Sequence, residues 1–476
     1  MEKGPTMNTQ TSTHTENDRL RRLELRLTEA FDDLWDNYVD SRDSLYDDDG
    51  TRWSLLGSGN SPGGTSTAGP MISQHQLAEI RMQCRGLAVA NEFAINAIEN
   101  RISYIVGSGH RYRAVTRELP KPGERNERTE ELCRRTQNFI DEFIEINNWH
   151  DRQQEIIRRG DRDGEVFLRL FTDPHGMTLV RFVEPDQVFT PADRTDDPAA
   201  TLGIHCSPGD VETVRGYWID SQWVDVDEIQ HRKMNVDANV KRGLPLFYPV
   251  RKNLARAEKL LRNMSTVAQI QSAIAIIRKH ASGSQASIRR FVENRAETQA
   301  TDASTGKTNY LQRYAPGTIL DAFAGTDYQF PAASIDAGSY VAVLQAELRA
   351  IAARLVMPEF MLSSDASNAN YASTMVAEGP AVRMFQRLQH AMIQADQRIM
   401  QRAIDSAARA GRLPDDAALL VRIEAIPPSL AVRDRLREAR ADEILLKSGI
   451  LSPQTMALRH GLDPQRESQL IGRIEQ

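Results

Sequence analysis

The stretch VRKNLARAEKLLRNMSTVAQIQSAIAIIRKH, residues 250–280, contains neither glycine nor proline. Its apolar side chains recur at steps of three and four residues, the period of one face of an α-helix: Leu260, Met264, Val267, Ile270, Ile274 and Ile277. At 1.5 Å per residue, the pattern predicts one uninterrupted helix about 45 Å long. The stretch carries seven basic residues against one acid, Glu258. The sequence therefore predicts a long cationic rod.

A second helix is predicted between Asp336 and Pro358. Its apolar side chains have the spacing of a seam where two helices pack: Val341, Leu344, Leu348, Ile351 and Leu355. Proline cannot continue a helix, so Pro358 is expected to end it. Residues 281–335, between the two helices, lack this periodicity and are rich in Ser, Thr, Gly, Ala and Gln. We therefore expect an antiparallel helical hairpin with a small excursion at its tip.

Upstream of the rod, the pattern changes from helices to short strands. Helices are expected between Met71 and about residue 148, with Asn91 as the N-cap of one of them. Strand-like runs bounded by turns lie further along the chain: 166–171, 178–183, 202–206 and 211–219. This part of the chain is therefore predicted to be an α+β module.

Downstream of the hairpin comes the polar loop SSDASNANYAS, Ser363–Ser373. A long helix to about Gly411 should follow, with a kink at Gly379-Pro380. A strand is expected at 419–423, and then a helical C-terminal segment. The predicted fold class is α+β, mainly helical.

Composition excludes several classes of protein. The chain has 476 residues, of which 40% are hydrophobic and 26% charged, so it can bury a core. Its three cysteines, Cys84, Cys133 and Cys206, are far apart, which argues against a disulfide scaffold. No apolar run reaches the roughly 20 residues of a membrane span, and no signal peptide is visible. We expect a soluble protein with no membrane partner.

Residues 1–70 are expected to form an acidic arm. Residues 1–75 contain 13 acidic and 7 basic side chains, a net charge of −6. The whole chain has the same net charge of −6, so the rest of the chain is neutral overall. The tract GSGNSPGGTSTAGP, Gly57–Pro70, has the composition of a flexible linker. We therefore expect one acidic helix tethered to the main body.

Motifs of enzymes and metal sites are not found. Thr301–Thr308, TDASTGKT, ends like a phosphate-binding loop, but it lacks the first glycine and a preceding apolar strand. Asp161–Gly164 resembles part of a calcium loop, but the twelfth position is Thr172 instead of an acid. The motif HExxH does not occur. We expect no enzymatic activity, no cofactor and no metal.

The order of these elements resembles that of the portal proteins of tailed bacteriophages, over about residues 75–470. Five segments resemble parts of that family: Gly164–Phe167, Phe182–Asp186, Arg242–Phe247, Asp365–Ser373 after Leu355–Pro358, and Gly449–Gly461. The acidic arm has no counterpart that we can place.

The resemblance implies the portal fold, with wing, two-helix stem, small clip and helical crown. The parts would be the arm and linker at 1–70, the wing at 71–246, stem helix 1 at 247–282, the clip at 283–335, stem helix 2 at 336–358, the tunnel loop, kinked helix and wing strand at 359–427, and the crown at 428–476.

The resemblance also implies a dodecameric ring at one capsid vertex of a virion, assembled in the host cytoplasm. Double-stranded DNA would pass through the ring during packaging and ejection, without sequence-specific binding. The implied protein partners are terminase, a head–tail adaptor, the major capsid protein and, as a further candidate, a scaffold protein.

A DNA channel must hold a rod that carries one negative charge per roughly 1.7 Å without trapping it. In a closed ring each side chain is multiplied by the number of subunits, so one lysine becomes a belt of positive charge. The basic candidates on the rod are Arg256, Lys259, Arg262, Arg278 and Lys279. The alternative for each is a solvated helix face, or an ion pair with an adjacent subunit.

Two further groups of candidates lie outside the rod. The tunnel-loop candidates for DNA contact are Asp365, Ser367, Asn368, Asn370 and Tyr371. For Asp365, Ser367 and Asn370, helix capping is the competing interpretation. The clip candidates for docking terminase or the adaptor are Arg289, Arg290, Arg295 and Lys307.

One rival function stays open, a helical adaptor or scaffold protein of a virion that forms no channel. Particle size and shape distinguish the two. Twelve copies of 53.5 kDa give a ring of about 640 kDa with an axial hole, whereas an adaptor would be a monomer or dimer.

Overall fold

The structure is a computed structural model. It describes residues 74–117, 127–197, 199–280, 298–301, 308–311, 318–323, 337–365, 367, 371–430, 435–459, 462, 467–468 and 470–471. The chain divides into two compact units, Met1–Met71 and Ile72–Gln476. The acidic arm expected at 1–70 lies outside the described residues, all of which belong to the second unit.

Four helices open the second unit: α2 (Gln74–Ala90), α3 (Glu92–Ile105), α4 (Glu127–Ile146) and α5 (Trp149–Asp163). The first three were expected, whereas α5 lies beyond the last helix expected from the sequence. Asn91 is the N-cap of α3, because its side-chain oxygen accepts hydrogen bonds from the backbone N–H groups of Phe93 and Ala94, at 3.2 and 3.1 Å. That prediction is confirmed.

The four strand-like runs expected from the sequence lie in two small antiparallel sheets, which also contain three strands that were not expected. The first has the order β3–β2–β8, and the second β4–β5–β6–β7. Their strands are β2 (Glu165–Thr172), β3 (Thr178–Val183), β4 (Ala200–Thr201), β5 (Ile204–Ser207), β6 (Asp210–Ile219), β7 (Gln222–Asp225) and β8 (Ile229–Lys233). Single 3₁₀ turns are η1 (Pro185–Gln187), η2 (Ala192–Arg194), η3 (Val226–Glu228) and η4 (Tyr248–Val250).

One apolar core joins the two sheets, because alternate side chains of each point to the same side. Phe167 of β2 and Ile229 of β8 pack with Ile204, Tyr217 and Val224 of the four-stranded sheet. A further antiparallel strand pair, β1 (Arg111–Thr116) with β13 (Val421–Ile426), joins segments that lie far apart in the sequence. With its long helices, the unit is α+β and mainly helical, so the predicted fold class is confirmed.

The helix predicted over residues 250–280 is shorter than expected. It is α6 (Arg251–Ala273), and the chain continues as strand β9 (Ile274–His280). Strand β9 pairs in parallel with β12 (Thr318–Phe323). The segment IAIIRKH that opens at Ile274 is rich in isoleucine, and β-branched side chains favour strands. The prediction of one uninterrupted rod is therefore wrong for its last seven residues.

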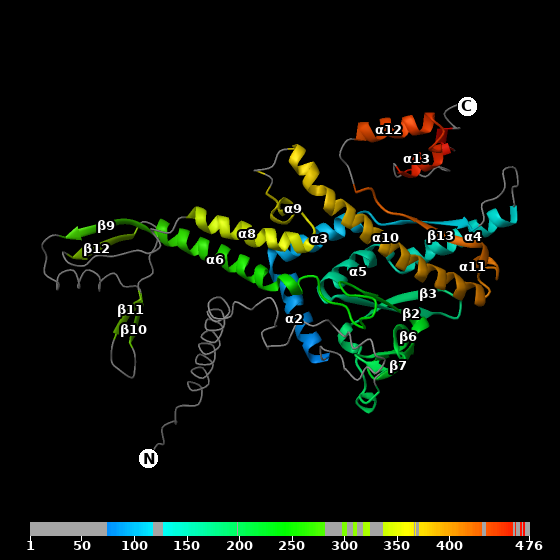
Figure 1. Cartoon of the computed structure of the whole chain (residues 1–476), viewed down its shortest axis with the longest axis horizontal. Coiled ribbons are helices and arrows are strands. Elements are labelled where there is room, and N and C mark those ends of the chain that lie inside the picture. The colour runs from blue at the N-terminus through cyan, green and yellow to red at the C-terminus, as the bar shows by residue number, and fades with distance from the viewer. Residues whose placement is uncertain are drawn as a thin grey trace, which may run out of the picture. The chain divides into compact units, whose positions relative to one another are not determined.

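The returning helix is α8 (Ala337–Leu355). Figure 1 shows α6 and α8 running antiparallel and side by side, so the predicted hairpin is confirmed. Leu254 of α6 and Leu348, Ile351 and Leu355 of α8 are buried, which makes this seam part of the core. Between the two helices, β10 (Thr298–Thr301) and β11 (Thr308–Leu311) form a short antiparallel pair.

After α8 comes a single turn of helix, α9 (Glu359–Ser363), with Pro358 at its N-cap. The long helix α10 (Tyr371–Arg409) begins inside the segment expected to be a loop and continues through Pro380. Residues 419 and 420 belong to α11 (Ala417–Leu420), so the strand expected at 419–423 starts two residues later, at Val421. The C-terminal helices are α12 (Arg435–Lys447) and α13 (Pro453–Arg459).

No helix within the described ranges combines the length and the apolar character needed to cross a bilayer.

Two glycines allow the chain to turn tightly between α5, β2 and the segment that leads to α6. Gly164 ends α5 with φ +83°, and its N–H donates to the carbonyl of Gly160 at 3.0 Å. A methyl group on Gly164 would overlap the backbone of Leu244, and one on Gly243 would overlap the Gly164 carbonyl. Only glycine fits both the φ and the space at 164.

We expect Gly164→Ala to destabilise the protein by about 3 kcal/mol, from left-handed strain plus a steric clash with backbone. Gly209→Ala is the matched control, because Gly209 has φ +77° but open space around it. It should cost only about 1 kcal/mol. Thermal unfolding of both variants measures the difference, and equal losses would contradict the role of close packing at Gly164.

Candidate functional site

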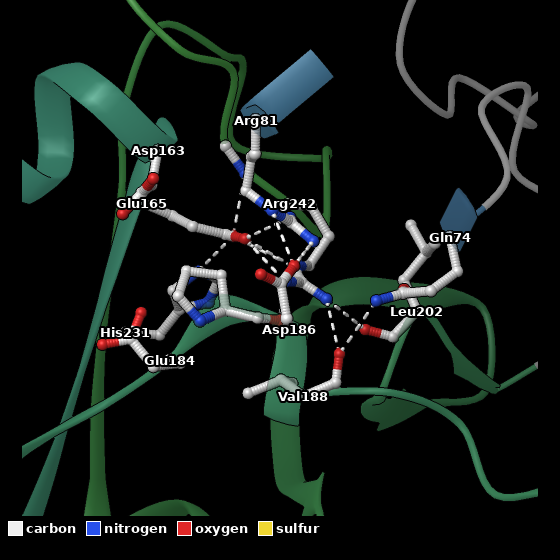
Figure 2. Close-up of polar contacts among 12 residues, drawn as sticks. Gln74, Arg81, Asp163, Glu165, Glu184, Asp186, Val188, Leu202, His231 and Arg242 are labelled. Carbon is white, nitrogen blue, oxygen red and sulfur yellow. Dashed lines mark hydrogen bonds and ion pairs between the residues drawn. The ribbon is translucent and has the colours of Figure 1, made fainter. Parts of the chain in front are cut away.

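Three segments that the sequence singled out meet at one buried place. Gly164–Phe167 begins β2, Phe182–Asp186 leads from β3 into η1, and Arg242–Phe247 precedes η4 and α6. Figure 2 shows Arg81 of α2 and Arg242 directed at the carboxylate of Glu165, with Asp186 and His231 beside them. We call these five residues the Glu165 junction.

Glu165 is surrounded by donors. Arg242 places Nε 2.8 Å and Nη2 2.7 Å from Oε1, and Arg81 places Nη1 3.3 Å from the same oxygen. The side chains of all three are at most 1% exposed. The other oxygen, Oε2, accepts the N–H of Gly243 at 3.1 Å and lies 3.0 Å from His231 Nε2. A buried charge is tolerable only when it is paired and hydrogen-bonded in this way.

Arg242 also holds the surrounding backbone. Its Nη1 donates to the carbonyls of Val188 and Leu202, each at 2.9 Å, and its Nη2 donates to that of Pro185 at 2.8 Å. The planar guanidinium can make several such bonds at once. The Arg242 side chain therefore holds two loops of the sheets against the segment that precedes α6.

The second arginine, Arg81, extends the junction to Asp186. Its Nη2 lies 2.7 Å from Asp186 Oδ1, and Arg85 Nη1 lies 2.9 Å from Oδ2 of the same carboxylate. Arg85 Nε also lies 2.6 Å from Asp163 Oδ1. The helix α2 is thus joined to α5 and η1 by charges at their contact.

The charges set the protonation states. Burial alone would raise the pKa of Glu165, but Arg242 and the hydrogen bond with His231 hold that pKa well below its usual range. Burial lowers the pKa of His231, so its imidazole is neutral at pH 7. Burial would likewise raise the pKa of Asp186, and the neighbouring Arg81 lowers it. The two arginines and the two carboxylates of the junction balance in charge.

Two further contacts fix the start of α6. The N–H of Leu246 donates to the carbonyl of Asp161 at 2.8 Å, and the Asp161 carboxylate is paired with buried Arg101, at 2.6 Å. Buried Asn91, which caps α3, uses its Nδ2 to donate to the Leu254 carbonyl and to Glu258 Oε2, each at 3.3 Å. These bonds hold α3, α5 and α6 in one body.

Along the hairpin, acids neutralise two of the rod's arginines within the same chain. Glu347 of α8 accepts from Asn253 Nδ2 at 2.7 Å and lies 3.1 Å from Arg256 Nε. Glu258 forms an ion pair with Arg262, one turn further along α6. Arg256 and Arg262 therefore have ion-pair partners in their own chain, whereas the alternative expected from the sequence was an ion pair with an adjacent subunit.

The stem candidates separate into two groups. Arg256, Lys259 and Arg262 lie on α6, and Lys259 is exposed. Arg278 and Lys279 lie on strand β9, so placing them on the long helix is wrong. Their register partners on β12 are Asp321 and Ala322.

The tunnel-loop candidates are partly described. Asp365 Oδ1 accepts the N–H of Ser367 at 2.9 Å, and both residues are exposed. The hydrogen bonds from Ser367 lower the pKa of Asp365. Tyr371 is the first residue of α10 rather than part of a loop, whereas Asn368 and Asn370 lie outside the described residues. This hydrogen bond closes a local turn at Asp365, between the end of α9 and the start of α10.

The base of this loop is anchored by residues that the sequence did not reveal. Asn96 Nδ2 donates to the carbonyls of Met361 and Leu362, at 2.9 and 2.6 Å, and Asn100 Nδ2 donates to that of Met361 at 3.0 Å. These amides hold the end of α9 on α3. Their spacing of four residues on one helix face was the only available signal.

Arg81 and His231 of the junction were also missed. A signal existed for Arg81, because it lies among the apolar residues Leu77, Ile80 and Cys84 on the buried face of α2. A charge in such a face needs a buried partner. The partner itself, Glu165, lies 84 positions away and could not be read from the pattern.

The clip candidates Arg289, Arg290, Arg295 and Lys307 lie outside the described residues. The segment that resembles a phosphate-binding loop connects β10 to β11, with Thr301 opposite Thr308. A phosphate cradle needs a strand followed by a helix, and this segment joins two strands. In the described part of the chain, no three His, Cys, Asp or Glu side chains are placed to hold a metal ion.

Comparison with known proteins decides the family. The model of the family described as "Phage portal protein, lambda family" matches residues 63–389, more than half of the chain. The chain belongs to this portal family. It is a structural protein of the phage virion, in the head–tail connector, and the expectation that it is not an enzyme is confirmed, because the family is structural.

No curated protein sequence matches the chain. Among solved structures, the neck of an empty GTA particle computed with C6 symmetry is 15% identical, with 82% of this chain and 94% of that chain covered and a TM-score of 0.41. The neck of a native GTA particle computed with C12 symmetry is 16% identical, with 84% and 96% covered and a TM-score of 0.38.

An HK97 family phage portal protein from Corynebacterium diphtheriae is 12% identical, with 76% of this chain and 98% of that chain covered and a TM-score of 0.29. All three TM-scores are below 0.5, so the family assignment rests on the sequence match alone.

We expect Glu165→Gln to destabilise the portal protein by roughly 3–5 kcal/mol, because the two buried arginines lose their shared counter-charge. Glu99→Gln is the matched control. Glu99 pairs with Arg158 on the surface, where both side chains are about half exposed. Such a pair contributes at most about 1 kcal/mol. Chemical denaturation of the two variants compares them, and similar losses would contradict the importance of the junction.

The pH dependence provides a separate prediction. The pKa of Glu165 is lower in the folded protein than its ordinary value of 4.5, so the unfolded chain takes up the proton more readily in acid. The stabilisation by Glu165 is therefore complete above about pH 4.5 and is lost as the pH falls below it. The free energy of unfolding should decline less steeply in acid for Glu165→Gln than for the parent, and parallel curves would contradict this.

Proposed function

We propose that this portal protein forms a ring of about twelve copies at one capsid vertex, and that double-stranded DNA passes through the ring during packaging and ejection. The observation that carries the proposal is the family match over residues 63–389. The antiparallel hairpin of α6 and α8 supports it, because two packed helices per subunit can line a bore as rigid elements.

The proposed channel guides DNA without gripping it. Phosphate contacts position a duplex without reading its sequence, and contacts to base edges would fix its register. Arg256 and Arg262 are paired with acids of their own subunit, which weakens their attraction for phosphate. We assign Lys259 to the lumen, because its side chain is exposed on α6 and an ammonium contacts phosphate as a point charge, without the bidentate geometry of arginine.

The division into parts is proposed with one change. The wing comprises 71–246 and 359–427, the crown 428–476, and the arm 1–70. The stem is now α6 and α8, and strand β9 joins the clip at 283–335, since it pairs with β12 inside that segment. We propose that the clip docks terminase and later a head–tail adaptor, and that the tunnel loop with Asp365 and Ser367 faces the DNA.

Purified protein should assemble into particles of about 640 kDa, twelve times the 53.5 kDa of one chain, with an axial hole. Light scattering gives the mass, and negative-stain electron microscopy shows the hole. A monomer or dimer at every salt concentration would instead favour the rival function, a helical adaptor or scaffold protein without a channel.

Charge reversal by Lys259→Glu should lower the yield of DNA-filled particles, because twelve added carboxylates would face the DNA. Lys259→Arg, which keeps the charge, is the control and should package normally. Ring assembly is measured alongside, by the mass of the purified particles. Loss of the ring in Lys259→Glu would place Lys259 at a contact between subunits, against a lumenal role.

A further inference from the structure

The four-stranded sheet has a second face that does not contribute to the core. Tyr217 and Val224 are register partners on β6 and β7 and are buried against Phe167 and its neighbours. Successive side chains of a strand point to opposite faces. The next pair in register, Trp218 and Trp223, therefore lies on the other face. Large exposed aromatic side chains on such a face are typical of interaction surfaces.

Trp223 is held in a fixed position there. A methyl group on Gly216 would overlap the ring of Trp223, so the ring rests directly on the backbone at Gly216. Trp218 contacts it edge-on at 5.3 Å between ring centroids, and His205 does so at 5.6 Å. Even so, Trp223 remains 44% exposed. The sheet therefore presents an aromatic surface that is rigid before any partner binds.

The surroundings of this surface are strongly acidic. Residues 193–227 contain eight carboxylates and two arginines, with no lysine. One of these arginines, Arg215, donates to Ser207 Oγ at 3.1 Å, and the other, Arg194, lies 3.6 Å from Asp193. Asp225 is opposite Gly216 in register, and Asp197 lies 3.7 Å from His205. The exposed carboxylates at Asp220, Asp225 and Asp227 surround the same hairpin.

We propose that this surface, which we call the Trp223 face (His205, Gly216, Trp218, Trp223 and Asp225), docks a basic segment of a partner protein through an Arg or Lys side chain. A cation stacks favourably on the face of an indole ring. The neighbouring carboxylates draw the cation in and pair with it. The same acids repel DNA, which excludes the genome as the occupant. This docking goes beyond the proposed channel and does not depend on it.

The proposal is tested on the full-length protein in the assembly state in which it is purified. The probe is a fluorescein-labelled peptide of alternating glycine and arginine, and binding is followed by fluorescence anisotropy at low salt. The same peptide with glutamine in place of arginine should not bind. Added salt should weaken binding of the arginine peptide, because exposed charges are screened.

Trp223→Ala should weaken binding of the arginine peptide by about tenfold, and Trp223→Phe by less, in the order of the cation affinities of the two rings. Asp225→Asn should also weaken binding and reduce its salt dependence. Asn keeps the cap that Asp225 provides to the N–H of Asp227, so the fold is preserved. Glu131→Gln removes an exposed carboxylate from α4 and is the control that should bind like the parent.

Three outcomes would overturn the proposal. The first is unchanged affinity in both Trp223→Ala and Asp225→Asn. The second is equal weakening by Glu131→Gln, which would mean that peptide binding depends only on the net charge of the protein. The third is a change in particle mass in Trp223→Phe with peptide binding intact, which would assign the surface to contact between copies of this chain. Binding of the peptide is independent of a DNA channel, so failure of one proposal is distinguishable from failure of the other.

Discussion

The architecture depends on the neutralisation of one buried carboxylate. Glu165 stands where α5 becomes β2, and burying its charge would be very costly without partners. The partners come from distant parts of the chain, Arg81 from α2 and Arg242 from the loop before α6. All of these segments must be in place together for the charge to be balanced. The junction therefore determines the direction in which α6 leaves the sheets, and through α6 it positions the whole hairpin.

The sequence predicts the helices of this fold better than their ends. A buried helix face must repeat at 3.6 residues, which is why the hairpin could be recognised. The pattern continues past Ala273 because Ile274 and Ile277 fit a helical face, yet β-branched residues fit a strand equally well. Pairing with β12 decides between the two, and that partner lies far along the chain. Short apolar runs remain ambiguous for this reason.

The candidate site was predictable only where its contacts are local. Glu258 and Arg262 stand four residues apart on one helix, so their pairing follows from the sequence. The pairing of Arg256 with Glu347 joins two helices, and it depends on how they pack. The same holds for the junction, whose three segments are recognisable separately in the sequence although their convergence is not. The Trp223 face was not predicted from the sequence, because the close placement of Trp223 on Gly216 needed the structure.

The double role of Asn91 has a mechanical consequence. Its amide oxygen caps α3 while its amide nitrogen bonds to α6, and the side chain is fully buried. If α6 twisted about its axis so that Leu254 and Glu258 moved out of reach, the buried nitrogen would lose its acceptors. Each subunit would then incur a penalty of about 1–3 kcal/mol. If α6 rotated in all copies together, the penalty would be incurred once in every subunit. One amide per subunit therefore resists torsion applied to the assembly.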